Sequence, residues 1–97
     1  MSEITLYKVT FNINGTAGVQ GAIFRETEKS YITTDSSSSR LANHYSRLNK
    51  NELGRFLIGH TPQEAVKLAY EHYKRRTSEA QYELQKYEGK LNAVEMI

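Results

Sequence analysis

The last third of the chain carries apolar or small residues at alternating steps of four and three. These residues are Val66, Tyr70, Tyr73, Thr77, Ala80, Leu84, Tyr87, Leu91 and Val94. An average step of about 3.5 residues places them along one stripe of an α-helix, as in the heptads of a coiled coil. The pattern therefore predicts one long amphipathic C-terminal helix over residues 61–97.

The start of this helix has a strong local signal. Thr61 suits the N-cap, Pro62 suits the first helical position, and Glu64 is placed to complete a capping box. An unbroken helix from there would be about 50 Å long at about 1.5 Å per residue. Residues 1–60 would form a body only about 25–30 Å across, so the distal end is predicted to protrude. A weaker capping pair that begins at Ser78 leaves a break in the helix as the alternative.

Residues 4–13 alternate in polarity and predict a β-strand. One face carries Tyr7, Val9, Phe11 and Ile13, and the other, predicted to face solvent, carries Lys8, Thr10 and Asn12. The glycine-bearing stretch 14–18 predicts a turn. Residues 19–25 and 30–34 predict a return strand and a third strand, which together give an antiparallel meander.

The middle of the chain predicts a short helix. Leu41, Ala42, Tyr45 and Leu48 follow at helical spacing after a polar loop. Residues 53–58 are apolar and bracketed by glycines, so they form either a fourth strand or a loop packed under the core. The fold class is therefore predicted as α+β. We expect one small domain, in which residues 1–60 form a sheet of three to four strands with one short helix, and residues 61–97 form the long helix.

Composition narrows the class of protein. The 97 residues contain no cysteine, which excludes disulfides, a thiolate nucleophile and zinc–cysteine sites. No apolar run is long enough to span a membrane, and the N-terminus does not resemble a signal peptide. We therefore expect a cytoplasmic protein without membrane association. The formal net charge of +2 gives little reason to expect nucleic acid as a partner.

A protruding apolar stripe predicts a protein interface. Leaving large apolar side chains in water forgoes about 1.5–3 kcal/mol for each of them. The predicted interface residues are Tyr73, Ala80, Leu84, Tyr87, Leu91 and Val94. We expect a homo-oligomer, with a dimer favoured, and a larger protein as a further partner. In an antiparallel dimer centred near Gln81, Lys67 would meet Glu95 of the other copy, whereas the opposite flank is repulsive.

Basic residues offer an alternative function in nucleic-acid binding. Lysine and arginine side chains neutralise phosphates, and neighbouring tyrosines provide stacking surfaces. The candidate residues are Arg40, His44, Arg47, Lys74, Arg75 and Arg76. No groove-reading motif accompanies them, so this function is not favoured over a solvated helix face.

Catalytic and metal-binding signals are missing from the sequence. His44, His60 and His72 have no ligand spacing, and the serine run 36–39 has no base that the sequence positions nearby. We therefore expect no enzyme activity, no cofactor and no metal. The predicted function is a small protein-binding module, such as an inhibitor, adaptor or accessory subunit. A viral or mobile-element protein that blocks host machinery would fit this size and composition.

Overall fold

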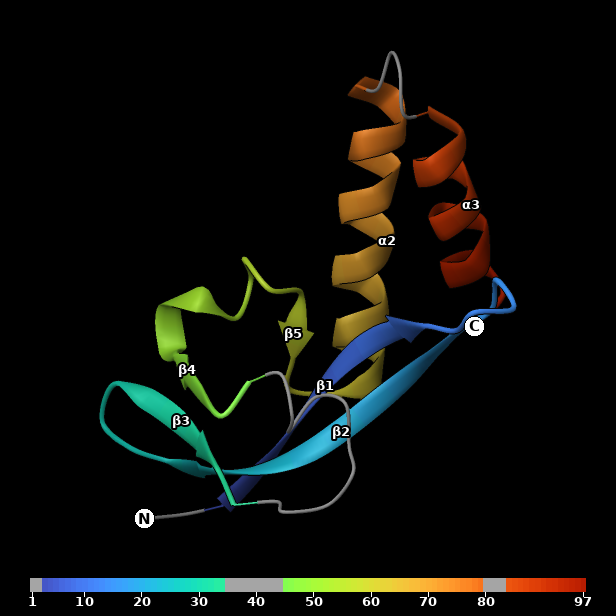
Figure 1. Ribbon diagram of the computed structural model, residues 1–97. Helices are drawn as coiled ribbons and strands as arrows, with labels where there is room; N and C mark the ends of the chain where they lie inside the picture. The colour runs from blue at the N-terminus through green and yellow to red at the C-terminus, as the bar shows by residue number, and fades with distance from the viewer. Residues whose placement is uncertain (1–2, 35–44, 80–83) are drawn as a thin grey trace.

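The computed structural model describes residues 3–34, 45–79 and 84–97, which adopt an α+β fold with a curled antiparallel sheet and two α-helices (Figure 1). The strands are β1 (Glu3–Phe11), β2 (Ala17–Glu26), β3 (Ser30–Thr33), β4 (Arg47–Asn49) and β5 (Ile58–Gly59). A 3-10 turn η1 (Lys50–Glu52) follows β4, and the helices are α2 (Pro62–Glu79) and α3 (Leu84–Glu95). The strand order in the sheet is β4-β3-β2-β1-β5.

The N-terminal meander is present as predicted. β1 and β2 pair along their whole shared length, with Val9 opposite Val19, and β3 pairs with the end of β2. The turn between β1 and β2 is closed by a hydrogen bond from the Asn12 N–H to the Thr16 carbonyl at 2.8 Å. Gly15 has a φ of +87°, a conformation that glycine adopts without steric cost.

The sheet has apolar clusters on both faces, whereas the sequence predicted a solvent-facing side. The first cluster contains Leu6, Ala22, Phe24, Tyr31, Leu48, Leu53 and Ile58. The second contains Val9, Ala65, Ala69 and Val94, and lies under the helices. Lys8 shares the face of Leu6, is half-buried, and donates a hydrogen bond from Nζ to the Phe56 carbonyl. The segment from β4 to β5 covers this face of β1 and β2. The face predicted to be exposed to solvent is therefore part of the core.

The predictions of three to four strands and of one short helix need correction. The described residues form five strands, because Arg47–Asn49 pairs with β3 and Ile58–Gly59 pairs with β1. Leu48, expected on a helix, sits in β4 and is 1% exposed. Pairing with β3 gives its backbone interstrand hydrogen bonds, and its side chain packs in the core cluster next to Tyr31 and Phe24. Residues 41 and 42 of the predicted helix lie outside the described residues.

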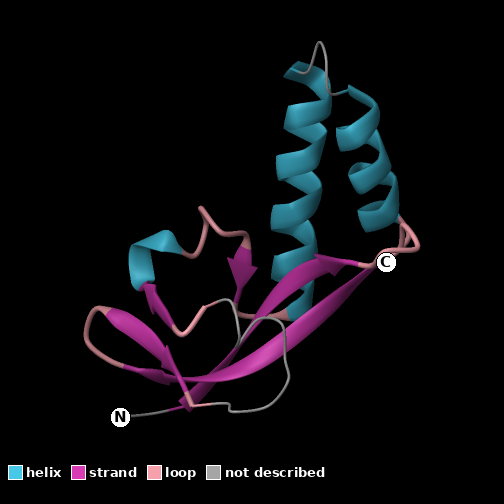
Figure 2. Cartoon of the chain, in the orientation of Figure 1, coloured by secondary structure: helices cyan, strands magenta, loops and turns pink. Residues whose placement is uncertain are grey.

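The single long helix is also wrong, because α2 ends at Glu79 and α3 begins at Leu84 (Figure 2). The two helices pack side by side, and α3 also contacts β1 and β2. The longest dimension of the molecule, 44 Å, is shorter than the rod of about 50 Å that an unbroken helix would form. Folding back buries Ala93 and Val94, which a rod would leave in water.

The predicted N-cap of α2 is confirmed, since the Glu64 N–H donates to Thr61 Oγ1 at 3.0 Å. We expect Thr61→Ala to lower the free energy of unfolding by about 1 kcal/mol, because this N–H loses its acceptor. Thr61→Ser keeps the hydroxyl and is the control. Urea denaturation followed by circular dichroism measures both variants, and equal stability of Thr61→Ala and wild type would contradict the cap.

Candidate binding groove

The predicted interface residues are drawn partly into the fold. Val94 is 2% exposed and packs with the buried alanines of α2, so it lies inside the chain. Tyr73 is half-buried, and its ring makes an edge contact with Phe11 at 5.4 Å between centroids. Tyr87 and Leu91 are half-buried on α3. Ala80 and the side chain of Leu84 lie outside what the structure describes. The stripe therefore serves first to join the two helices to the sheet.

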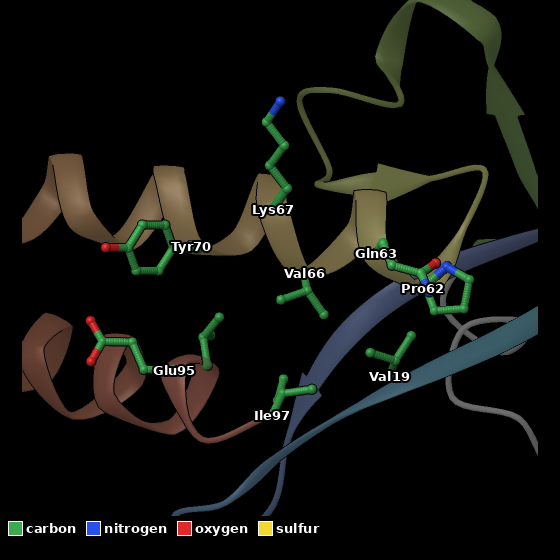
Figure 3. A pocket seen from close by; sticks show the side chains of 9 residues that line it. Val19, Pro62, Gln63, Val66, Lys67, Tyr70, Glu95 and Ile97 are labelled. Atoms are coloured by element: carbon green, nitrogen blue, oxygen red, sulfur yellow. The ribbon is translucent and has the colours of Figure 1, made fainter.

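An open groove remains between the first half of α2 and the end of α3, with β2 as its floor (Figure 3). Its volume is about 650 Å³. Val66 from α2, Val19 from β2 and Ile97 after α3 point toward one another across it. Tyr70 lies further along α2, and the buried Val94 lines the groove from α3. The groove is thus lined mainly by aliphatic carbon.

Two apolar residues that follow α3 remain exposed. Ile97 is 49% exposed although it lines the groove, and the adjacent Met96 is 86% exposed. Exposed apolar side chains that occur singly need no explanation, but apolar residues beside an apolar hollow indicate an interaction surface. The groove and these two residues are called the α2–α3 surface below.

Two opposite charges flank the groove. Lys67 rises from α2 on one side, and Glu95 projects from α3 on the other (Figure 3). Both side chains are exposed. Within the described part of the chain, the ion pair is Lys50 with Glu26 at 2.6 Å, and neither Lys67 nor Glu95 has such a partner. Both charges are therefore available to a binding partner.

The nucleic-acid candidates that the structure describes lie on two separate elements. Arg47 lies on β4 at one edge of the sheet, whereas Lys74, Arg75 and Arg76 lie toward the far end of α2 (Figure 1). Arg40 and His44 lie outside the described residues. Lys74 Nζ lies 5.5 Å from the centre of the Tyr70 ring, a cation–π arrangement within one helix.

Lys90 of α3 also lies near two aromatic rings. Lys90 Nζ lies 5.4 Å from the centre of the Phe11 ring and 5.6 Å from that of Tyr73. Burial lowers the pKa of His72, and the nearby charges of Arg76 and Arg75 lower it further. Burial also raises the pKa of Tyr73. The contact of Lys90 with Phe11 joins α3 to β1.

Other candidate chemistry gains no support from the geometry. Among the residues that the structure describes, no three histidine, aspartate or glutamate side chains come together as metal ligands. Burial lowers the pKa of Lys8, but its amine already binds the Phe56 carbonyl. The hairpin turn predicted at residues 14–18 is present, but it is shorter than predicted, because β2 already begins at Ala17.

The sequence missed the groove because its walls come from distant segments. Val19 belongs to a strand and Ile97 follows the last helix, and only the reversal between Glu79 and Leu84 brings them together. Val66, Tyr70 and Val94 were part of the predicted stripe, so the sequence identified residues of the two helical walls but not Val19 or Ile97.

Comparisons with known proteins give no assignment: the chain matches no protein-family model, no curated protein and no solved structure. In the described ranges, neither helix combines the length and the apolar character needed to cross a membrane.

Proposed function

We propose that this chain is a non-enzymatic protein-binding module that docks through the α2–α3 surface. The observation that supports the proposal is the open groove of about 650 Å³, where Val19, Val66 and Ile97 converge, together with the exposure of Met96, the residue before Ile97. Apolar hollows of this kind receive anchor side chains from a partner and dominate the binding energy of an interface.

A protein fits this surface better than a small molecule does. A ligand confined to the groove would leave Met96 and the outer part of Ile97 in water. A protein partner covers the hollow and the adjacent apolar side chains together, and its polar groups can meet Lys67 and Glu95 at the rim. Coverage of the whole surface therefore favours a macromolecular partner.

This proposal moves the docking site from the distal stripe to the base of the helix pair. The expected roles as an inhibitor, adaptor or accessory subunit stay part of it, as do a viral or mobile-element origin and a cytoplasmic location. Each of these roles requires one stable contact with another protein. Of the described nucleic-acid candidates, Arg47 lies on β4 and the others lie on α2, so we keep nucleic-acid binding as the alternative that is not favoured.

Substitution of Ile97 tests the proposed function. The tagged chain is used to capture proteins from the cells that express it. We expect Ile97→Asp to reduce recovery of its specific partner about tenfold or more, because a carboxylate cannot enter an apolar hollow without losing hydration. Ile97 is half exposed, so the fold should tolerate the change.

Ile23→Asp is the matched control, because Ile23 is 43% exposed on β2 and does not line the groove. It should leave recovery unchanged, and circular dichroism should show that both variants are folded. Equal recovery of the same partner by Ile97→Asp, Ile23→Asp and wild type would refute docking through this surface.

A further inference from the structure

We propose that the occupant of the α2–α3 surface is a second copy of this chain, related to the first by a two-fold axis that runs along the groove. The inference rests on the proposed function, since it names the partner of the same site. Two observations support it. Lys67 and Glu95 carry opposite charges on the two sides of the groove, and the same surface contains both an apolar hollow and exposed apolar side chains.

The charges flanking the groove are complementary to themselves. A two-fold axis lying in an interface and directed along the groove places the α2 side of one copy against the α3 side of the other. Lys67 of each copy then lies on the same flank of the interface as Glu95 of its partner, and this pairing of opposite charges occurs twice. Both residues are exposed and lack an ion-pair partner among the described residues, so pairing them displaces no contact that the structure shows.

The apolar residues of this surface can also be complementary to those of a second copy. A surface that binds its own copy needs groups that fill a hollow as well as the hollow itself. Val19, Val66 and Ile97 line the groove, but about half of the Ile97 side chain is in solvent, and the preceding residue, Met96, is 86% exposed. In the two-fold arrangement each copy can present its projecting residues to the other, which buries apolar area on both chains at once.

This arrangement places the helix pairs of the two copies against each other, with each α2 beside the partner's α3. Four helices packed in this way are a common solution for covering amphipathic faces. The exposed charges favour this orientation over others but add little affinity by themselves. The apolar residues therefore supply most of the binding energy, and Lys67 and Glu95 select the geometry.

Charge reversal tests the two-fold pairing directly. Analytical ultracentrifugation of the wild type at high micromolar concentration should give twice the mass of the 97-residue chain. We expect Lys67→Glu and Glu95→Lys each to weaken the dimer about tenfold, since each change turns two attractive contacts into two repulsive ones. The double variant Lys67→Glu with Glu95→Lys restores both pairs and should recover the affinity of the wild type.

Matched controls reverse charges on the turn between β2 and β3, away from the helices. Lys29→Glu and Glu28→Lys change the same net charge at exposed positions and should leave the dimer unchanged. Thermal unfolding of all variants accompanies the mass measurement. A loss of stability in Lys67→Glu with no change in mass would show that the pair acts within one chain, and would overturn the proposal.

A monomer at high micromolar concentration would also overturn it, as would a dimer that the double variant fails to restore. These outcomes are distinct from failure of the proposed function. If the chain is monomeric but Ile97→Asp still abolishes capture of a different protein, the groove is a docking site for that protein and only the self-association falls.

Discussion

Replacing Phe24 with alanine is expected to lower the free energy of unfolding by about 3–5 kcal/mol, because a large aromatic ring is removed from a fully buried site. Phe24 is 0% exposed on β2 and packs in the cluster that includes Leu6, Tyr31 and Leu48. Small domains have total stabilities of about 5–15 kcal/mol. We therefore expect a marginally folded protein that gives a broad, low-temperature unfolding transition.

The neighbouring Ile23 provides the control for this prediction. Its side chain lies on the opposite face of the same strand and is 43% exposed. Ile23→Ala should cost less than about 1 kcal/mol, the range of substitutions at partly exposed sites. Urea titrations of both variants measure the difference. Similar losses at the two positions would show that the cluster under β4 and β5 is not the main core.

Gly59→Ala is expected to lower the free energy of unfolding by about 2–3 kcal/mol, as overpacking against rigid backbone does. A Cβ built on Gly59 would lie 2.7 Å from the Ala65 backbone nitrogen and 2.9 Å from the Glu64 Cβ. The first turn of α2 therefore approaches β5 so closely that only glycine fits. An added methyl would have to push the start of α2 away from the sheet.

Gly54→Ala is the matched control for this close approach. A Cβ at Gly54 meets nothing within 4 Å, and its φ is not positive. The substitution should leave stability unchanged or raise it by up to about 1 kcal/mol, since alanine restricts the unfolded chain. Thermal unfolding compares the two, and a harmless Gly59→Ala would mean that α2 does not depend on this contact.

The elements that sequence predicted correctly are those fixed by local chemistry. Strand alternation between residues 4 and 25, the turn at Gly15 and the cap at Thr61 each depend on residues a few positions apart. These signals do not change with the arrangement of the rest of the chain, so they survive folding. The α+β class follows from them.

The helix reversal was harder to predict because the same spacing of apolar residues occurs in one continuous helix and in two helices that pack against each other. Apolar residues every three or four positions cover an external partner in a continuous rod, or join two helices of one chain. Val94 illustrates the second case, since it packs under α2 with Ala65 and Ala69. Neither glycine nor proline occurs between residues 78 and 84 to mark the end of α2.

The strand β4 was missed for a related reason. Tyr45 and Leu48 are three positions apart, which suits one face of a helix, but a strand of three residues is too short to show alternation. Only pairing with β3 determines its conformation, and that contact joins positions about 17 residues apart in the register of Tyr31 with Leu48. The groove was beyond prediction because its walls span most of the chain.

Apolar clusters lie on both sides of β1 and β2, so two separate cores stabilise the molecule. The helix pair adheres to one side through Val9 and its neighbours, and the segment from β4 to β5 adheres to the other around Leu6. Partial opening of a native protein follows such divisions. We expect amide protons of α3 to exchange with solvent through a local opening that leaves the cluster around Leu6 intact. The part of the molecule that contains the groove can then rearrange while the rest stays folded.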